Sequence, residues 1–341
     1  MNNVLFKDLN NVVSSNIIDW RNIENSSILI TGSTGLIGSL LVKAIILKKC
    51  NVKLVLPVRS IDKAIDLFGD TNNIEYIKCD IEHFFYDKPV DYIIHAASPT
   101  KSNFFVNYPV ETIDTAIFGT KKILDYCCRF NIKSVVYLSS MEMYGVLESK
   151  NVTEDDLGYL NNMDIRSSYS ESKRLCELYC KSYFEEYGVP VKIARLAMTF
   201  GPGIPKSENR VYKYFCDCVL NNEDIILRST GETVINFCYT VDAVIGILCI
   251  LLNGRNGEAY NIVSDNEDET IKSIAEWMIQ KYGNGKNRVI CQPSNETTAF
   301  APNNHMILCN NKLKSIGWKS CITLKEAFNN LLIYIKEELY E

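Results

Sequence analysis

The fold is decided by the stretch Thr31-Gly32-Ser33-Thr34-Gly35-Leu36-Ile37-Gly38, which follows an apolar strand-like run and opens an apolar helical run. Gly32 permits the tight turn, Gly35 lets the backbone approach a pyrophosphate, and Gly38 lets the helix pack on the strand. The N-terminus of such a helix offers free N–H groups to an anion. The pattern predicts a dinucleotide-binding βαβ unit. The residues expected at the cofactor are Gly32, Thr34, Gly35, Leu36, Ile37 and Gly38.

Short apolar runs alternate with longer helical segments over most of the first two hundred residues. We expect strands at 27–31, 52–58, 74–78, 92–96, 134–139 and 191–196. We expect helices at 36–48, from about 61 onward, and at 106–130 and 167–187. This alternation is typical of a parallel sheet covered by helices on both faces. The predicted fold class is α/β: a Rossmann doubly wound parallel sheet with a smaller C-terminal substrate lobe.

The order becomes less regular after Gly201-Pro202-Gly203. Helices are expected there at 211–220, 241–252, 271–282 and 324–339, and short strands at 225–227 and 260–263. We therefore expect an N-terminal helical extension (1–25), an NAD(P)-binding Rossmann domain (26–200) and a smaller substrate-binding lobe (201–341). A segment near 235–265 should return to pack on the main domain. Ligands bind beyond the carboxyl ends of parallel strands, so the lobe would form the far wall of that cleft.

Two further strand ends carry residues that suit a bound dinucleotide. Asp80 and Ile81 follow the expected third strand, where a carboxylate can accept a hydrogen bond from an adenine amino group. Ala96, Ala97 and Ser98 follow the fourth, with small side chains where the backbone passes the cofactor. We expect all five residues to contact the cofactor.

The end of the expected second strand selects between NAD and NADP. An acidic side chain there would bond to the ribose hydroxyls of NAD and repel the additional phosphate of NADP. This chain has Arg59 instead, with Lys63 one helical turn further on. An arginine can pair with the 2′-phosphate, and a solvated surface charge is the alternative interpretation. The expected cofactor is NADP or NAD, with NADP modestly favoured.

Tyr169 and Lys173 form a Tyr-x-x-x-Lys pattern in a segment expected to be helical. Side chains four residues apart share one helix face, so the ammonium can lie beside the phenol. With a cationic nicotinamide nearby, this charge lowers the tyrosine pKa toward neutrality and makes the phenolate a usable base. A second match, from Tyr282 to Lys286, falls in a glycine turn and cannot present both groups on a helix. Ser140, leaving the expected fifth strand, can hydrogen-bond the reacting hydroxyl.

The glycine loop, the serine and the tyrosine–lysine helix together resemble the extended short-chain dehydrogenase/reductase family, specifically its sugar-nucleotide epimerase/dehydratase branch. The resemblance covers residues 27 to about 265. Stretches 95–120 and 139–145 are most similar to UDP-glucuronate decarboxylases, and GDP-mannose 4,6-dehydratases are also similar. The resemblance implies a nucleotide-sugar substrate and a homodimer. It also implies that Tyr169 and Lys173 contact the cofactor.

The resemblance implies a reaction in which Tyr169 removes the proton of the sugar 4-hydroxyl while the C4 hydride moves to the nicotinamide. The resulting 4-ketone acidifies C5 and weakens bonds at C6, and the hydride then returns to the altered sugar. Glu142 occupies the place where such lyases keep a carboxylate for work at C5, and an exposed loop glutamate is the alternative. The implied activity is that of a dehydratase, decarboxylase or epimerase. The expected catalytic residues are Ser140, Glu142, Tyr169 and Lys173.

Several positions depart from the family pattern. Met141 stands where two-carboxylate dehydratases have an aspartic acid, so no acid is available there to protonate a departing 6-hydroxyl. Met198 replaces an asparagine near the diphosphate, and Ile235 replaces a diphosphate-binding arginine. Arg210 or Arg228 is expected to compensate, unless the substrate itself is unusual, and the identity of nucleotide and sugar stays open. The residues expected to contact the substrate are Thr100, Ser140, Met198, Arg210 and Arg228.

Composition excludes several classes of function. The formal net charge is −5 and no basic run occurs, which argues against nucleic-acid binding. The longest apolar stretch, 243–252, is too short to span a bilayer, and the first residues do not resemble a signal peptide. Thirteen scattered cysteines without metal-ligand spacing predict reduced thiols in the cytoplasm and no metal site.

The oligomeric state and two other functions stay open at this point. Apolar side chains at helical spacing, including Leu175, Leu178 and Tyr179, are expected to face a second copy or only to cover their own sheet. An NADPH-dependent reductase of a keto-sugar nucleotide is favoured by Arg59 and Met141 and opposed by Glu142. A non-catalytic NADP-binding sensor or scaffold is opposed by the intact serine, tyrosine and lysine.

Overall fold

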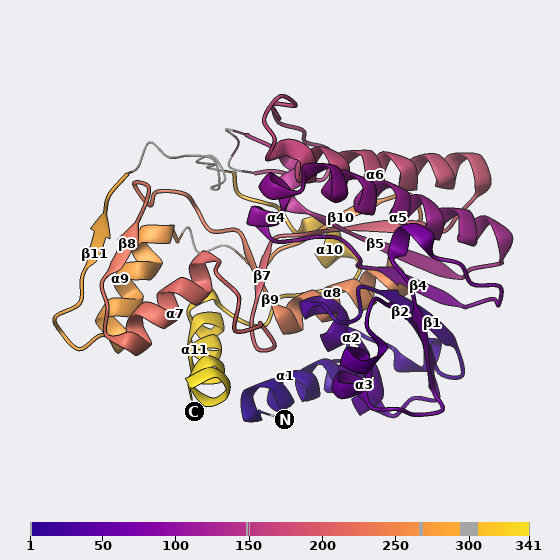
Figure 1. The fold of residues 1–341 in the computed structure, drawn as a ribbon, viewed down its shortest axis with the longest axis horizontal. Coiled ribbons are helices and arrows are strands. Elements are labelled where there is room, and N and C mark those ends of the chain that lie inside the picture. The colour runs from indigo at the N-terminus through magenta and orange to yellow at the C-terminus, as the bar shows by residue number, and fades with distance from the viewer. Residues whose placement is uncertain (1, 148, 150, 266–268, 294–305, 341) are drawn as a thin grey trace.

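The computed structural model describes residues 2–147, 149, 151–265, 269–293 and 306–340, and a seven-stranded sheet dominates it (Figure 1). Every pairing in this sheet is parallel. Chain order reverses beside the central first strand, which places the dinucleotide crevice there. The predicted α/β fold class is confirmed. Across the sheet the strands are β10 (Ala259–Ile262), β6 (Val191–Leu196), β5 (Ser134–Ser140), β4 (Tyr92–His95), β1 (Ser27–Thr31), β2 (Lys53–Val58) and β3 (Ile74–Lys78).

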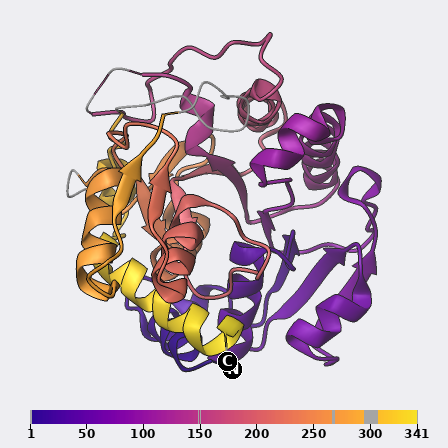
Figure 2. The same cartoon turned by 60° about the vertical axis from the view of Figure 1, so that its left-hand side comes forward.

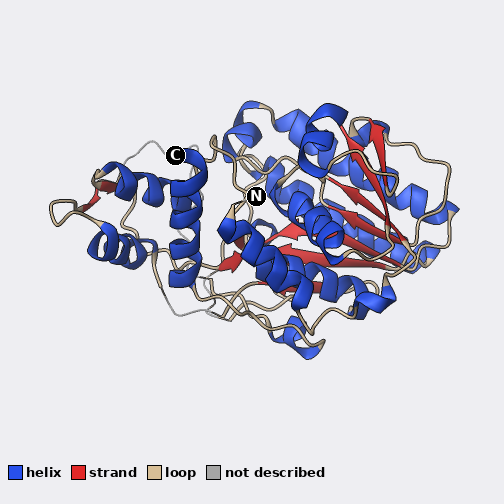
Figure 3. Cartoon of the chain, turned by 90° about the horizontal axis from the view of Figure 1, so that it is seen from below, coloured by secondary structure: helices blue, strands red, loops and turns tan. Residues whose placement is uncertain are grey.

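Helices cover both faces of the sheet (Figure 3). Ile28 and Ile30 of β1 point into one apolar layer and Leu29 into the other, as the period of two in a strand requires. The Ile28 layer is covered by α1 (Asn3–Ser14), α2 (Leu36–Lys48), α3 (Ile61–Phe68) and α8 (Thr240–Asn253). The Leu29 layer is covered by α5 (Pro109–Arg129) and α6 (Ser167–Tyr187), with α4 (Ser102–Asn107) beside them. None of the described helices is long and apolar enough to cross a membrane.

The helix expected at 106–130 is two helices. Helix α4 ends at Asn107, and α5 begins at Pro109. The residue before a proline avoids the helical conformation, and Tyr108 accordingly has φ −135° and ψ 60°. Proline itself suits the first position of a helix, since its missing N–H would have no partner there. Phe105 of α4, ahead of the break, is 1% exposed.

The elements after β6 divide between the main sheet and a separate cluster (Figure 2). Strand β10 joins the main sheet, and helix α8 packs on that sheet. The short helix α10 (Asn311–Ser315) packs beside β10. Strands β7 (Met198–Phe200) and β9 (Phe237–Tyr239) pair where the two parts meet. The other elements form the separate cluster: α7 (Val211–Asn221), β8 (Ile225–Leu227), α9 (Ile271–Tyr282), β11 (Val289–Cys291) and α11 (Leu324–Ile335). The helix expected at 324–339 is also corrected, because α11 ends at Ile335 and a π-helical stretch covers Lys336–Tyr340.

Helix α1 is attached to the body of the protein through a buried carboxyl group. The hydroxyl of Tyr239 donates to Asp8 Oδ2 at 2.6 Å, and the Asp8 side chain lies within the core. Burial raises the pKa of Asp8 to about 6, although its hydrogen bond with Tyr239 acts in the opposite direction. The ionised carboxylate is therefore less stable in the folded chain than in the unfolded chain.

This burial predicts a pH-dependent contribution to folding stability. The pKa of Asp8 is higher in the folded chain than in the unfolded chain. The stability associated with the protonated Asp8 is therefore fully present below about pH 4 and is lost as the pH rises through 6. The variant Asp8→Asn keeps an acceptor for Tyr239 and carries no charge, so it should be more stable than the parent at pH 7, by up to about 3 kcal/mol. Thermal melting of both proteins between pH 4 and 7 measures the difference. A difference that does not change with pH would contradict the assignment.

Candidate active site

The carboxyl ends of β1 and β4 are joined by a hydroxyl group. Thr31 Oγ1 accepts hydrogen bonds from the backbone N–H groups of Ala96 and Ala97 at 3.1 and 3.0 Å, and it lies 2.7 Å from His95 Nδ1. The threonine proton therefore points to Nδ1, and Nε2 of the ring donates to Thr120 Oγ1 at 3.2 Å. Burial and the charge of Lys173 lower the pKa of His95 to about 3, so the ring is neutral. This neutral cluster fixes the strand ends on which the crevice is built.

The glycine loop lies directly on this cluster and fits a dinucleotide. Gly32 has φ +65°, and a Cβ added there would lie 2.7 Å from the carbonyl carbon of Ala96. A Cβ on Gly38 would lie 2.3 Å from the Gly32 carbonyl oxygen, so helix and loop can touch only without side chains. The buried Ser33 hydroxyl has no hydrogen-bond partner among the described residues, and the first turn of α2 carries no acid. A pyrophosphate would meet free N–H groups and no negative charge here.

The other residues expected at the cofactor lie along the same edge of the sheet. Arg59 is exposed immediately after β2, and Asp80 is exposed after β3. Ile81 is buried and fills the space that Gly119 of α5 leaves free. The remaining members, Thr34, Leu36, Ile37, Ala96, Ala97 and Ser98, are half-buried around the loop.

Tyr169 and Lys173 lie together on the buried face of α6. The ammonium of Lys173 donates to the Leu138 carbonyl oxygen at 2.8 Å and lies 5.7 Å from the centre of the Tyr169 ring. Burial lowers the pKa of Lys173 to about 8. The ring of Tyr169 stacks on Phe105 of α4, with centroids 4.2 Å apart and planes inclined by 6°. Phe105 therefore fixes the orientation of the phenol.

The pKa of Tyr169 in the protein alone is not near neutrality, and the lowering expected from Lys173 together with a cationic nicotinamide stays a prediction. Burial raises this pKa far above its ordinary range, and the nearby charge of Glu142 raises it further. A hydrogen bond with Ser140 and the charges of Arg210 and Arg166 lower it, but burial is the larger effect. The phenol consequently stays protonated until further positive charge arrives. A phenolate in this apolar place needs more positive charge than the surrounding residues supply.

Glu142 is held by an arginine that the sequence analysis did not single out. Arg166 Nη1 donates to Glu142 Oε2 at 3.0 Å, and Nη2 donates to Oε1 at 3.3 Å. Ser170 Oγ lies 3.5 Å from the same Oε2. Both carboxylate oxygens are thus engaged end-on by one guanidinium. The signal available in the sequence was spacing, because Arg166 precedes Tyr169 by three residues, one helical turn.

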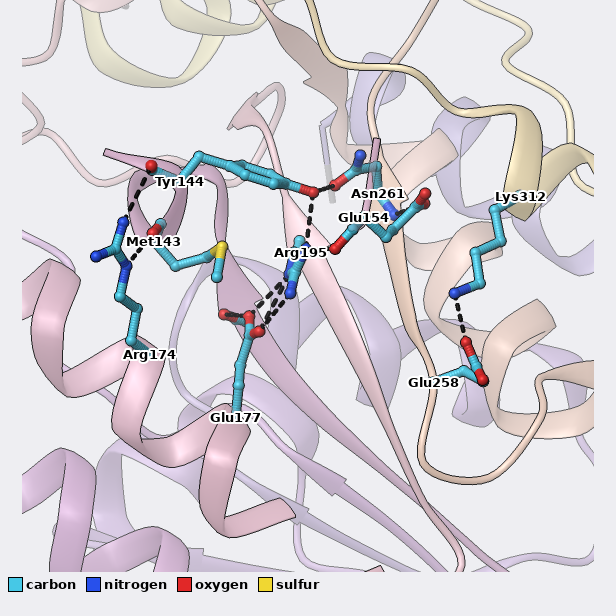
Figure 4. A network of polar contacts seen from close by, with 10 residues as sticks. Met143, Tyr144, Glu154, Arg174, Glu177, Arg195, Glu258, Asn261 and Lys312 are labelled. Atoms are coloured by element: carbon cyan, nitrogen blue, oxygen red, sulfur yellow. Dashed lines mark hydrogen bonds and ion pairs between the residues drawn. The ribbon is translucent and has the colours of Figure 1, made fainter. Parts of the chain in front are cut away.

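The turn that carries Glu142, Met141–Tyr144, is held by two further arginines (Figure 4). Arg174 donates to the carbonyl oxygens of Met143 at 2.6 Å and Tyr144 at 3.1 Å. Arg195 forms a buried ion pair with Glu177 at 2.7 Å and donates to the Tyr144 hydroxyl at 2.9 Å. Tyr144 in turn donates to Asn261 Oδ1 of β10 at 2.7 Å. The network joins α6, β6 and β10 to the turn.

The residues expected to contact substrate are brought together only in part. Arg210 lies immediately before α7, pairs with Glu208 at 2.7 Å and is close enough to Tyr169 to lower its pKa. Met198 is half-buried in β7, and Thr100 is exposed in the segment after β4. Arg228 is exposed, and its charge acts to lower the pKa of Tyr214. Ile235 is 4% exposed and belongs to the apolar core, so its position contributes no polar group to the crevice.

Comparison with known proteins gives a family and several relatives. The model described as "NAD dependent epimerase/dehydratase family" matches residues 28–263. The chain is 27% identical over 318 residues to UDP-glucuronic acid decarboxylase 1 of Xenopus tropicalis, covering 93% of this chain and 73% of the relative. It is 23% identical over 326 residues to dTDP-D-glucose 4,6-dehydratase of Bos taurus, covering 92% and 89% respectively.

Solved structures share the fold. An epimerase from Methanothermobacter thermautotrophicus superposes with a TM-score of 0.79 at 22% identity, covering 95% of this chain and 96% of that one. The UDP-glucuronic acid 4-epimerase of Bacillus cereus, solved with UDP-glucuronic acid and NAD, gives 0.77 at 21% identity, covering 91% and 99%. At these sequence identities the structural similarity shows a shared fold and nothing more.

Proposed function

Because this chain belongs to the NAD dependent epimerase/dehydratase family, we propose that it oxidises C4 of a nucleotide-bound sugar and then eliminates, decarboxylates or epimerises the 4-keto sugar. Its relatives are enzymes, so the non-catalytic alternative is not retained. The observation that carries the proposal is the placement of Glu142 beside the Tyr169–Ser140 pair, with its carboxylate held by Arg166. A C4 oxidation alone would not require that carboxylate.

The chain's own residues divide the chemistry. Ser140 hydrogen-bonds Tyr169 and can share that bond with a sugar hydroxyl, which orients the proton to be moved. Tyr169 is the proton acceptor, and Lys173 supplies a buried positive charge on the same helix face. A nicotinamide held at the glycine loop would supply hydride acceptance and return, and its positive charge would add to that of Lys173. Glu142 serves the later step at C5 or C6.

We propose NADP as the preferred form of the cofactor. We propose a cofactor site made of Gly32, residues 34–38, Arg59, Asp80, Ile81, residues 96–98, Tyr169 and Lys173. The family is NAD-dependent by its description. The support for NADP is Arg59, an exposed cation after β2 at a point where no acid stands. In this proposal residues 26–200 form the domain that binds the dinucleotide, and residues 201–341 form the lobe that binds the nucleotide sugar. Residues 1–25 form an N-terminal helical extension.

Tyr169→Phe should abolish hydride transfer and leave cofactor binding nearly intact, since only the phenol oxygen is removed and the stacking on Phe105 survives. Losing a general base typically costs about 100- to 10,000-fold in rate. Stopped-flow absorbance of reduced nicotinamide measures it. Tyr282→Phe, from the second Tyr-x-x-x-Lys match, is the matched control and should behave like the parent. Near-normal turnover of Tyr169→Phe would remove Tyr169 from the mechanism.

Glu142→Gln should separate the two steps. Oxidation at C4 depends on Tyr169 and Ser140, so the variant should still generate reduced nicotinamide. It should then stall with a 4-keto sugar, because an amide cannot take the C5 proton or assist loss at C6. Absorbance of reduced nicotinamide and product mass report the two steps separately, and exposed Glu185→Gln on the same helix as Tyr169 is the control. Unchanged product formation would favour a simple 4-epimerase or a reductase.

Arg59→Asp should reverse the preference for NADP. The carboxylate would repel the 2′-phosphate and accept hydrogen bonds from the ribose hydroxyls of NAD. Titration of both dinucleotides into parent, Arg59→Asp and the exposed control Arg21→Asp measures the preference. Tighter binding of NAD than NADP by the parent would refute the proposal.

We also propose a homodimer formed by α5 and α6. Apolar side chains on these helices face solvent, including Val110, Phe118, Leu175 and Leu178, which are 64%, 50%, 40% and 61% exposed. Tyr179, which was expected on this face, packs on the chain's own core instead. A second copy would cover the exposed set. Light scattering at micromolar concentration should give twice the chain mass, and Leu178→Glu should shift it toward the monomer; a monomeric parent would contradict the pairing.

The place of action that we propose is the cytoplasm. The support is the scattered set of thirteen cysteines, which suits a reducing compartment.

A further inference from the structure

One side of helix α6 contacts the turn that carries Glu142 at three successive positions. Arg166, Ser170 and Arg174 are spaced by four residues, so their side chains project from the same side of the helix. The first two meet the Glu142 carboxylate, and the third meets the backbone of the turn. Tyr169 belongs to the same helix, one residue before Ser170. The position of Glu142 relative to Tyr169 is therefore set through a single rigid element.

Arg174 is committed to the main chain. Its Nε donates to the Met143 carbonyl oxygen at 2.6 Å, and its Nη2 donates to those of Tyr144 at 3.1 Å and Gly158 at 2.7 Å (Figure 4). Met143 and Tyr144 are the last two residues of the turn, where carbonyl groups run out of partners within a helix. The Nη1 atom lies 3.8 Å from Glu171 Oε1, and a partly exposed ion pair of this length contributes little.

The Arg174 guanidinium also joins the turn to the segment that precedes α6. The N–H of Gly158 donates to the same Tyr144 carbonyl oxygen at 2.8 Å. A Cβ at Gly158 would collide with the carbonyl oxygens of Val146 and Tyr144, so segment and turn touch backbone to backbone. Because one guanidinium binds both parts, it fixes the turn against α6 as well as against this neighbouring segment.

The serine of the site is held by other contacts. Ser140 is the last residue of β5 and is paired with β6 in the sheet. The preceding Ser139 donates to Glu177 of α6 at 2.5 Å. Neither contact involves Arg174. Loss of the Arg174 guanidinium should consequently displace Glu142 and leave Ser140 in place.

We propose that Arg174 is a positioning residue for Glu142, which holds the backbone of the Met141–Tyr144 turn against α6 so that the carboxylate is in place for the step after C4 oxidation. The inference rests on the proposed function and assigns part of its later step to a residue that touches neither sugar nor dinucleotide. Displacing a reacting group by about 1 Å can cost about 100-fold in rate. The effect should fall on the second step, because Tyr169 and Ser140 keep their own supports.

The test follows single turnovers of the dinucleotide-loaded chain with UDP-glucuronate and with dTDP-glucose. Arg174→Met removes every N–H donor and keeps an unbranched side chain. Reduced nicotinamide should form nearly as fast as in the parent, and its reoxidation and the product mass should appear about 10- to 100-fold more slowly. Arg174→Lys presents one ammonium in place of the planar fork, so it should recover part of the second step. Arg255→Met, at an exposed arginine, is the control and should behave like the parent.

A double-mutant cycle distinguishes positioning from a general structural role. In a Glu142→Gln background the carboxylate is already gone, so Arg174→Met should slow the second step no further. A merely structural residue would slow both steps alike and would act equally in both backgrounds. Either of these results would overturn the inference.

Amide hydrogen exchange of the turn tests the attachment without a sugar. The N–H of Glu142 donates to Ser140 Oγ and that of Gly145 to the Glu142 carbonyl oxygen. Both should exchange about 10-fold faster in Arg174→Met, because charged hydrogen bonds that oppose local opening are lost. Unchanged exchange would overturn this inference alone. A parent chain that yields neither reduced nicotinamide nor a new product mass with either sugar nucleotide would overturn the proposed function, and with it the step assigned to Arg174.

Discussion

The ion pair between Glu177 and Arg195 sets the geometry on which the site depends. Glu177 belongs to α6, the helix that carries Tyr169 and Lys173, and Arg195 belongs to β6. Arg195 also holds Tyr144, so the helix and the Glu142 turn are positioned by one guanidinium. Both side chains are below 10% exposed. Removing one partner of such a buried pair typically costs about 3–5 kcal/mol, because the other charge is left uncompensated. The position of Glu142 relative to Tyr169 is thus fixed by the core and not by a surface loop.

Most of the sheet could be predicted because its signals are local. The bounds of β1, β3, β6, α2 and α6 are those that the alternation of apolar runs predicted. The glycine loop was equally predictable, since Gly32 and Gly38 occupy positions where any Cβ would collide with backbone. The sequence also contains a signal for the division of the expected 106–130 helix, namely Pro109. It was missed because the apolar periodicity continues across the break.

The site could be predicted only as far as motifs reach. Tyr169 and Lys173 were found from their spacing, Ser140 from its place after the fifth strand, and Glu142 from the family resemblance. Their expected roles remain predictions. Arg166 and Phe105 were missed because each acts through a partner distant in sequence: Glu142 for Arg166, and Tyr169 for Phe105. The pKa of Tyr169 could not be predicted either. Its direction follows from the balance between burial and four neighbouring groups, which no sequence pattern contains.

That balance has a functional consequence. A tyrosine whose pKa were low in the protein alone would bury a permanent phenolate beside Glu142, at the cost of desolvating two negative charges. In this protein the phenol is instead kept neutral, Lys173 is committed to a backbone carbonyl, and Arg166 is committed to Glu142. Among the described residues, the positive charges near the phenol do not outweigh the effect of its burial on the pKa. In the proposed mechanism, proton removal from the substrate would therefore be coupled to cofactor binding at the glycine loop, because the bound nicotinamide would bring the additional positive charge that stabilises the phenolate.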